Sequence, residues 1–372
     1  MNRLLFTLLS FLGICLFSQS TFACTTFCLN TGSRTIVGTN FDFIEGNGFI
    51  FINKQGISKT ALESHQKHLS PLKWTSNYGN ITFNWWGREF PYTGINEVGL
   101  VISSLGLRPT EYPPANSKAA IVSSQWAQYC LDSFKTVKEV IKNISGITVI
   151  PPLGTLGKLH YFICDKTGDC AVIEYLNGRI ICYTQKDLPI KVLTNTEYAK
   201  SLKCLRSGII PAPDHIASID RFVRTAKALQ TQTSEKKGLS IEHAFDTLEL
   251  TRMGEITEVD GEQIRSYLAT EWSIVFDIDN LKVYYKTFDN KKIRHFNLSS
   301  LDFSCKTQVK VLDIRQNTSG DVSKVFIDYK NELNNNFINK SRSIIPRLSR
   351  DPEKTLKMIM NYPETTACTN PR

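Results

Sequence analysis

The sequence predicts an α+β protein built from antiparallel sheets with helices packed on their outer faces. The predicted elements come in separate runs of strands, helices, strands and helices, without the strict alternation of a doubly wound parallel sheet. Several neighbouring strands are joined by short, turn-rich segments of the hairpin type. No internal repeat or long linker is visible, so residues 24–372 are expected to form a single domain.

The first run of strands opens with a hairpin. Cys24–Thr31 and Thr35–Phe43 have strand character, and Gly32-Ser33 supplies the turn residues between them. Further strands are predicted at Phe49–Asn53, Ile81–Trp86 and Leu100–Leu105. Residues 55–80 are polar and are expected to be irregular.

Apolar residues at helical spacing mark the next elements. Thr136 and Glu139 form a capping box before Val137–Ile144, and Ser240 is the expected N-cap of Ile241–Arg252. The other predicted helices are Ser123–Phe134, Ile216–Gln230 and Val322–Ile345, and the tail after residue 345 is expected to be irregular. The remaining predicted strands are His160–Cys164, Cys170–Leu176, Arg179–Thr184, Trp272–Asp277, Leu281–Phe288, Lys292–Leu298 and Thr307–Ile314.

Residues 1–23 have the organisation of a secretory signal peptide. Arg3 supplies a positive charge, and Leu4–Phe17 is an apolar run too short for a stable membrane span. Thr21-Phe22-Ala23 is a small-x-small cleavage site, so cleavage would leave Cys24 as the first residue. We therefore expect a periplasmic or secreted protein. An uncleaved anchor helix and lipidation of Cys24, which would block its α-amine, remain open as alternatives.

The charges of the chain argue against a nucleic-acid partner. The formal net charge of +9 falls to +8 without Arg3, and the basic residues are interspersed with acidic ones instead of forming a block. The six histidines are scattered and no C-x-x-C is present, so no metal site is expected. Cys164 and Cys170 flank a turn, and an exported chain meets an oxidising compartment, so these two are expected to form a disulfide.

Several motifs together carry a family resemblance. The chain from Cys24 to about Thr287 resembles the linear-amide C–N hydrolases, which include bile salt hydrolases and penicillin V acylases. The matching segments, in order, are Cys24-Thr25-Thr26-Phe27, Gly38-Thr39-Asn40-Phe41-Asp42, Ile95-Asn96-Glu97-Val98-Gly99-Leu100, Leu193-Thr194-Asn195, Ser218-Ile219-Asp220-Arg221-Phe222-Val223-Arg224 and Thr270-Glu271-Trp272-Ser273. The resemblance implies a four-layer αββα sandwich of the N-terminal-nucleophile hydrolase type. It also implies a cysteine amidohydrolase that acts on a small-molecule linear amide without a cofactor.

Four residues receive catalytic roles in this interpretation. Cys24 is the expected nucleophile, because a cysteine at the start of a chain has its own α-amine as a nearby base. The resemblance assigns Asp42 to holding that amine and assigns the side-chain amide of Asn195 to the oxyanion. Arg221 is expected to bring a guanidinium near the sulfur and favour the thiolate.

Two positions depart from the family pattern. Many members have an arginine where this chain has Thr39, and an Asn or Tyr oxyanion donor where it has Gly106. A backbone N–H is one replacement for the missing donor at Gly106. Trp85 and Trp86 are expected to line an acyl pocket, with packing in the core as the alternative. The departures leave open a catalytically impaired or lipid-anchored binding protein of the same fold, and a homo-oligomer is compatible with the sequence.

Overall fold

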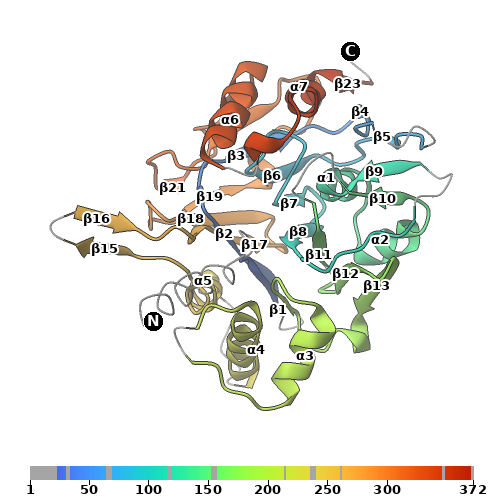
Figure 1. Cartoon of the computed structure of the whole chain (residues 1–372). Coiled ribbons are helices and arrows are strands. Elements are labelled where there is room, and N and C mark those ends of the chain that lie inside the picture. The colour runs from blue at the N-terminus through green and yellow to red at the C-terminus, as the bar shows by residue number, and fades with distance from the viewer. Residues whose placement is uncertain are drawn as a thin grey trace, which may run out of the picture.

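Two large β-sheets face each other across a shared apolar core (Figure 1). The computed structural model describes residues 23–30, 34–63, 69–114, 119–151, 157–212, 215–234, 240–259, 262–345 and 348–369. The predicted signal peptide therefore lies outside the described residues, apart from Ala23.

The first sheet has seven strands, of which the predicted N-terminal hairpin supplies the second and third. Their order is β14 (Val192–Leu193), β1 (Thr25–Asn30), β2 (Thr35–Phe43), β17 (Ala269–Asp277), β18 (Lys282–Thr287), β19 (Arg294–Asn297) and β21 (Gly320–Asp321). Neighbours pair antiparallel except β19 and β21, which pair parallel. Every residue of β2 is buried, because strands flank it on both sides and the sheet is covered on both faces.

The second sheet has nine strands, all paired antiparallel with their neighbours. Their order is β13 (Arg179–Thr184), β12 (Cys170–Leu176), β11 (Leu159–Cys164), β8 (Val101–Gly106), β7 (Thr93–Asn96), β6 (Asn80–Asn84), β3 (Phe49–Asn53), β20 (Lys310–Asp313) and β22 (Ile327–Asp328).

Helices cover the outer faces of both sheets. Helices α4 (Ser218–Ser234) and α5 (Ile241–Glu249) pack on the first sheet, with α3 (Tyr198–Arg206) beside α4. Helix α1 (Ser123–Ser133) packs on the second sheet, and a second apolar cluster there includes residues of α2 (Val137–Ile144). Figure 1 shows α3, α4 and α5 together at one end of the molecule and α6 (Asn331–Ile344) and α7 (Glu353–Asn361) at the other. The α+β class with two large antiparallel sheets is therefore confirmed.

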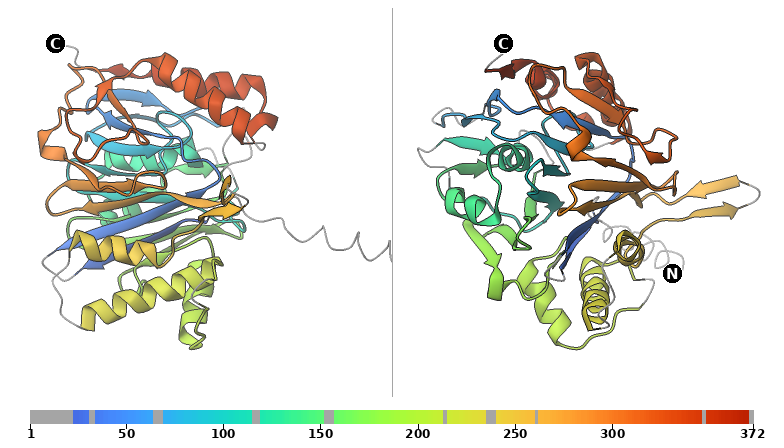
Figure 2. Two further views of the ribbon diagram at one scale, coloured as in Figure 1. Left: turned by 90° about the vertical axis from the view of Figure 1, so that its left-hand side faces the viewer. Right: turned by 180° about the vertical axis from the view of Figure 1, so that it is seen from behind.

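Short strands complete the structure. They form the pairs β9 (Ala120–Val122) with β10 (Thr148–Ile150) and β15 (Ile256–Val259) with β16 (Glu262–Arg265), and the three-stranded sheet β23 (Ala367–Cys368), β4 (Ile57–Thr60) and β5 (Lys73–Thr75). The β15–β16 hairpin projects from the body of the molecule in Figure 2.

Most of the helices and strands that the sequence predicts from local residue patterns are present in the structure. The Thr136 hydroxyl accepts a hydrogen bond from the Glu139 N–H at 3.2 Å, and the Ser240 hydroxyl accepts one from His243 N–H at 3.2 Å. Both predicted N-caps are thus confirmed. The strand predicted at Ile81–Trp86 ends at Asn84, before the two tryptophans.

Three predictions for connecting and C-terminal segments were wrong. Residues 55–80 contain β4 and β5, which are stabilised by pairing with each other and with β23 from the far end of the chain. The last long helix begins at Asn331 instead of Val322, because Ile327–Asp328 pairs with β20. The tail is not irregular, since α7 buries Leu356 and Ile359 at helical spacing after Pro352.

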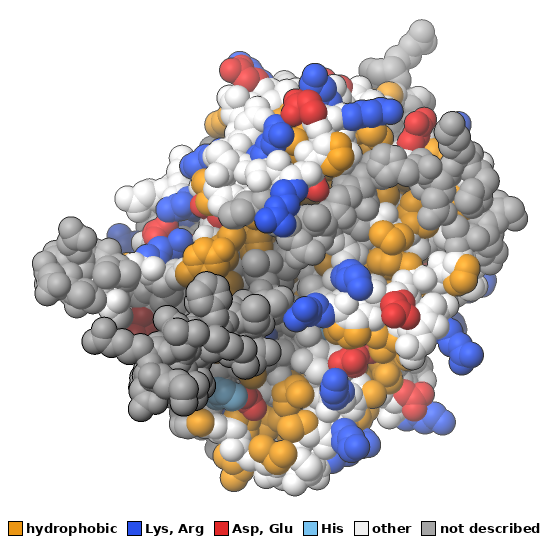
Figure 3. All heavy atoms as spheres, in the orientation of Figure 1, with side chains coloured by type: hydrophobic (Ala, Val, Ile, Leu, Met, Phe, Trp, Pro, Cys, Tyr) orange, Lys and Arg blue, Asp and Glu red, His pale blue; other side chains and the backbone are white. Residues whose placement is uncertain are grey.

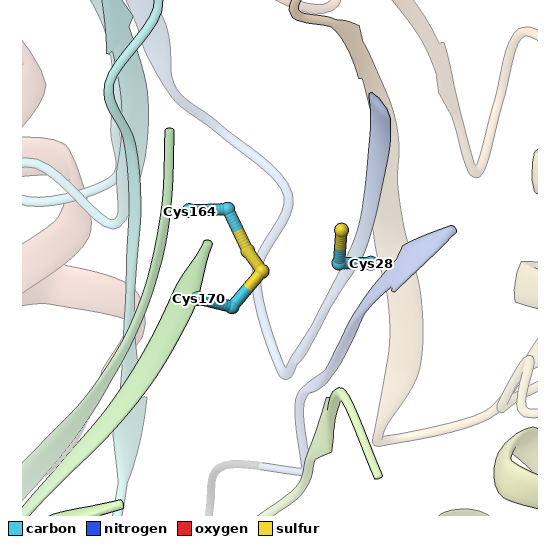
Figure 4. Close-up of side chains that lie close together, drawn as sticks. All are labelled: Cys28, Cys164 and Cys170. Carbon is cyan, nitrogen blue, oxygen red and sulfur yellow. A yellow bond between two sulfur atoms is a disulfide. The ribbon is translucent and has the colours of Figure 1, made fainter. Parts of the chain in front are cut away.

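The predicted disulfide between Cys164 and Cys170 is present, joining the paired strands β11 and β12. A second disulfide, which spacing did not reveal, joins Cys305 to Cys368. Cys28 of β1 is a buried free thiol whose sulfur lies within 4.8 Å of the sulfurs of Cys164 and Cys170 (Figure 4). Burial raises the pKa of Cys28 to about 12, which keeps the thiol protonated beside the disulfide.

The surface agrees with the interspersed charges of the sequence. On the face shown in Figure 3, Lys and Arg side chains are scattered among Asp and Glu side chains. Within the described ranges, no helix combines the length and the apolar character needed to cross a membrane.

Gly38 packs tightly against the ring of Phe27 in the N-terminal hairpin, and this contact can be tested by substitution. A Cβ at Gly38 of β2 would lie 2.5 Å from the ring of Phe27, its partner on β1, and Phe27 is fully buried. Gly38→Ala should therefore lower the free energy of unfolding by about 1–3 kcal/mol. Urea denaturation of Gly38→Ala, Phe27→Leu and the double variant measures this. The double variant should lose less than the sum of the single losses, and strict additivity would contradict the proposed clash.

Candidate active site

Cys24 lies immediately before β1, at the point where the first sheet meets helix α4. Its side chain is 1% exposed, and the next residue, Thr25, pairs with Asn40 of β2. The preceding N–H of Ala23 donates to the backbone carbonyl of Asp42 at 3.3 Å. The register of the hairpin thus brings Cys24 beside the end of β2 that carries Asp42.

Arg221 joins the start of β1 to helix α4. Its Nη1 donates to the Cys24 carbonyl and to Thr25 Oγ1, both at 2.6 Å, and its Nη2 donates to Asn195 Oδ1 at 2.9 Å. Nε donates to the carbonyl of Ile216 at 3.2 Å. The guanidinium is 1% exposed and lies 3.7 Å from Asp42 Oδ2. Burial lowers the pKa of Arg221, while the charges of Asp42 and Cys24 oppose that shift.

The orientation of the Asn195 amide follows from its partners. Arg221 has only donors, so it must face the amide oxygen of Asn195. The nitrogen Nδ2 then donates one hydrogen to the carbonyl of Gly106, at the end of β8, at 2.9 Å. An amide nitrogen carries two hydrogens, so this contact uses one of them. The backbone N–H of Leu107, the residue after Gly106, donates a hydrogen bond to the Lys158 carbonyl at 2.8 Å. This N–H is therefore already used within the fold.

Asp42 is fully buried, and only one of its two carboxylate oxygens accepts a hydrogen bond. Its Oδ1 accepts from Thr270 Oγ1 at 2.5 Å, and Thr270 is its direct partner on β17. Its Oδ2 has no hydrogen-bond partner among the described residues. Burial raises the pKa of Asp42 to about 7, while Arg221 and the Thr270 hydrogen bond act in the opposite direction.

The surroundings of the Cys24 thiol oppose its ionisation in the 372-residue chain. Burial and the nearby charge of Asp42 raise its pKa to about 12. A backbone hydrogen bond from Asp42, the Tyr92 hydroxyl and the charge of Arg221 act in the opposite direction. The charge of Arg221 thus acts to lower the pKa of Cys24, but it does not overcome the effect of burial.

Tyr92 lies close to Cys24, and no catalytic role was predicted for it from the sequence. Its hydroxyl lies within hydrogen-bonding reach of the Cys24 sulfur. The same hydroxyl lies 2.9 Å from Thr39 Oγ1. A position before β7 in the second sheet cannot be related to Cys24 by spacing alone, because the two residues meet only when the sheets pack.

The structure brings together most of the predicted site residues. Cys24, Asp42, Asn195, Arg221 and Gly106 form one connected set of contacts. Their catalytic roles stay predictions.

Trp85 and Trp86 belong to a series of neighbouring aromatic rings that begins at Tyr92. The Tyr92 and Phe41 ring centroids are 4.7 Å apart, those of Phe41 and Trp85 are 6.3 Å apart, and those of Trp85 and Trp86 are 5.9 Å apart.

Trp85 and Trp86 differ in exposure. Trp86 is 7% exposed and belongs to the core between the sheets, whereas Trp85 is only partly buried. Both packing and pocket lining are therefore compatible with Trp85, while burial favours packing for Trp86.

Among the residues that the structure describes, one group of three side chains has atoms of the kind that bind metal ions close together. Cys28, Cys164 and Cys170 have their sulfur atoms within 4.8 Å of one another. Two of these sulfurs are joined as a disulfide and so cannot act as thiolate ligands in this state.

The chain matches one protein family over most of its length. The profile of the linear amide C–N hydrolases, choloylglycine hydrolase family, matches residues 24–207 and 204–311. The chain therefore belongs to this family, and the match begins at Cys24.

Two curated relatives are similar over parts of the chain. Penicillin V acylase of Pectobacterium atrosepticum is 32% identical over 174 residues, which are 42% of this chain and 46% of that protein. Bile salt hydrolase/transferase of Lactiplantibacillus plantarum is 26% identical over 246 residues, which are 56% of this chain and 73% of that protein. The chain thus matches about half the length of the first of these relatives.

Solved structures confirm the fold. Penicillin V acylase of Agrobacterium tumefaciens superposes with a TM-score of 0.69 at 21% identity, over 82% of this chain and 98% of that one. A mutant of conjugated bile acid hydrolase from Clostridium perfringens gives a TM-score of 0.65 at 17% identity, over 80% and 98% of the two chains. The fold is thus that of these two hydrolases, as the family resemblance implied.

The role of the Arg221 fork can be tested directly. Lysine keeps a positive charge but presents one ammonium in place of a planar fork, so it cannot reach Cys24, Thr25 and Asn195 together. Arg221→Lys should lower the free energy of unfolding by about 3 kcal/mol, because partners of a buried charge lose their contacts. Chemical denaturation measures the loss. The control Arg224→Lys, one turn along α4, should change stability by less than about 1 kcal/mol, and equal losses in the two variants would contradict the role of the fork.

Proposed function

We propose that this chain is an exported cysteine amidohydrolase that cleaves a linear, non-peptide amide through an acyl-enzyme on Cys24. Removal of residues 1–23 would make Cys24 the first residue of the working enzyme. Family membership supports the reaction class, and the start of the family match at Cys24 supports the identity of the first residue. Two disulfides support a periplasmic or secreted location, because such bonds persist in oxidising compartments.

The observation that carries this proposal is that Asp42 Oδ2 has no hydrogen-bond partner among the described residues, although it lies 3.7 Å from the Arg221 guanidinium. A fully buried carboxylate oxygen without a hydrogen-bond donor is costly, and such an orphan calls for an explanation. The backbone that precedes Cys24 runs beside Asp42, since Ala23 N–H bonds to the Asp42 carbonyl. Cleavage after Ala23 would turn the Cys24 nitrogen into an α-ammonium with donors for Oδ2. The site is thus incomplete in the unprocessed chain and completed by processing.

The chemistry then follows from the positions of the groups. The α-amine, with an ordinary pKa of about 7.7–8.0, accepts the thiol proton as the sulfur attacks the amide carbonyl. The second hydrogen on Asn195 Nδ2 stabilises the oxyanion, a type of contact typically worth about 3–4 kcal/mol. The amine returns its proton to the leaving nitrogen, and water then hydrolyses the thioester. Arg221 keeps Cys24 and Asn195 in fixed relation during these steps.

The substrate is a small molecule with a linear amide. The matched relatives are named for penicillin V and for bile salts, so amides of these two kinds are the first to assay. The aromatic series from Tyr92 through Phe41 to the partly exposed Trp85 supports an apolar acyl group. A catalytically impaired or lipid-anchored binding protein of the same fold is the alternative, and intact mass of the purified protein separates them by showing a free or an acylated Cys24.

Processing should change how stability depends on pH. In the unprocessed chain the Asp42 pKa is about 7 against an ordinary 3.8, so the folded chain keeps a proton that the unfolded chain releases. Its free energy of unfolding should fall as pH rises from about 4 to 7. The new ammonium should lower the Asp42 pKa and remove this fall.

Chemical denaturation of both forms across pH 4 to 7 measures the effect of processing. The processed protein should become progressively more stable than the unprocessed one as pH increases. Asp42→Asn should abolish that pH-dependent difference. Parallel curves for the two wild-type forms would show that the amine does not reach Asp42.

Replacement of the nucleophile tests the proposed reaction. Cys24→Ser keeps the amine and the shape of the side chain, but a hydroxyl is much harder to ionise than a thiol. The variant should be exported and folded, while hydrolysis of a panel of penicillin V-type and bile-salt-type amides falls by orders of magnitude. Cys182→Ser, at a partly buried free cysteine of β13, is the matched control and should keep its activity. Full activity of Cys24→Ser would overturn the nucleophile assignment.

A further inference from the structure

Tyr92 is held rigidly against the nucleophile strand. It precedes β7, its backbone N–H donates to the Phe83 carbonyl at 2.9 Å, and its side chain is 3% exposed. Its ring packs on that of Phe41, with centroids 4.7 Å apart. The position of the Tyr92 hydroxyl is therefore fixed by the packing of the second sheet against the first.

The Tyr92 hydroxyl lies close to three polar groups at the open end of the N-terminal hairpin. It donates to the Asn40 carbonyl at 2.7 Å and lies 2.9 Å from Thr39 Oγ1, and the Cys24 sulfur is within hydrogen-bonding reach. The single hydrogen of Thr39 Oγ1 can go to the Thr25 carbonyl, 3.3 Å away, or to the phenol oxygen. Thr39 is fully buried, so solvent does not satisfy its hydroxyl.

The hydrogens in this cluster have a limited number of arrangements. A phenol has one hydrogen to donate, whereas its oxygen can accept from two sides. While Cys24 is a thiol, the phenol hydrogen goes to the Asn40 carbonyl, which can only accept. When the sulfur loses its proton, it becomes the stronger acceptor, because hydrogen bonds to ionised groups are roughly twice as strong as neutral ones. Rotation of the O–H bond is sufficient to redirect the hydrogen from Asn40 to the sulfur.

We propose that Tyr92 is a further catalytic residue, which donates its hydroxyl hydrogen to the Cys24 thiolate, and that Thr39 is a positioning residue for that hydroxyl. This inference rests on the proposed function of Cys24 as nucleophile. It gives Thr39 a role that does not require a charge at that position. The Thr39 hydroxyl donates to the phenol oxygen when the phenol hydrogen turns to the sulfur.

The protonation states around Cys24 are consistent with this role. Burial raises the pKa of Tyr92 well above its ordinary value, so the phenol keeps its hydrogen at working pH. The charged groups that face the sulfur are Asp42 of β2, which opposes ionisation, and Arg221 of α4, which favours it. Tyr92 supplies a neutral donor from the opposite sheet.

Alkylation of the processed protein by iodoacetamide across pH tests the proposal without a substrate. The rate of labelling at Cys24, followed by peptide mass, reports the thiolate fraction. Tyr92→Phe should raise the apparent pKa of labelling by about one unit, which slows the reaction about tenfold near neutral pH. Thr39→Val should shift it in the same direction by a smaller amount, and Thr39→Ser should restore the wild-type profile. If Tyr92→Phe does not fold, the two Thr39 variants carry the test.

The control is Tyr175→Phe, which removes another buried tyrosine hydroxyl from β12, in the apolar cluster beneath α1 and α2. Its labelling profile should match that of the wild type. In amide hydrolysis, Tyr92→Phe should lower kcat about tenfold and leave KM within about twofold. A Tyr92→Phe labelling profile that superimposes on the wild type would overturn the proposal, whatever the hydrolysis rates. A shifted profile in a protein that hydrolyses no amide would support Tyr92 and overturn the proposed function.

Discussion

The buried guanidinium of Arg221 is the contact on which the geometry of the site depends. It binds the backbone of Cys24, the hydroxyl of Thr25 and the amide of Asn195 at once, and so joins helix α4, strand β1 and the segment after β14. A planar group with five donors in a fixed arrangement can orient three partners simultaneously, which a flexible ammonium cannot do. Because Arg221 accepts nothing, it also decides which way the Asn195 amide points.

This arrangement is unfavourable for the stability of the fold. Burial disfavours the charged forms of both Arg221 and Asp42, whose side chains approach to 3.7 Å. Removing ions from water costs several kcal/mol per ion, and the attraction within a pair does not always offset this cost. Strongly shifted groups at one buried point are typical of functional sites. Asp42 fits this pattern, because its Oδ2 atom is buried without a hydrogen-bond partner among the described residues.

The site lies where the two sheets meet, and both contribute to it. The first sheet and its helices supply Cys24, Asp42, Asn195 and Arg221, whereas the second supplies the carbonyl of Gly106 and the hydroxyl of Tyr92. The packing of apolar side chains between the sheets therefore sets the distances within the site. Protein interiors are packed as densely as organic crystals, so small changes in that core are transmitted to groups that it positions.

The sequence by itself determined the features that depend on neighbouring residues. These include the N-terminal hairpin, the N-caps at Thr136 and Ser240, and the Cys164–Cys170 disulfide across a turn. The order of its motifs also singled out Cys24, Asp42, Asn195 and Arg221, which the structure brings into one set of contacts, while their catalytic roles stay predictions. Only the tertiary structure decided the Cys305–Cys368 disulfide, the pairing of β4 with the C-terminal strand, and the approach of Tyr92 to Cys24. Each of these joins residues dozens to hundreds of positions apart, and no local periodicity records which distant surfaces will pack together when the two sheets close on a common core.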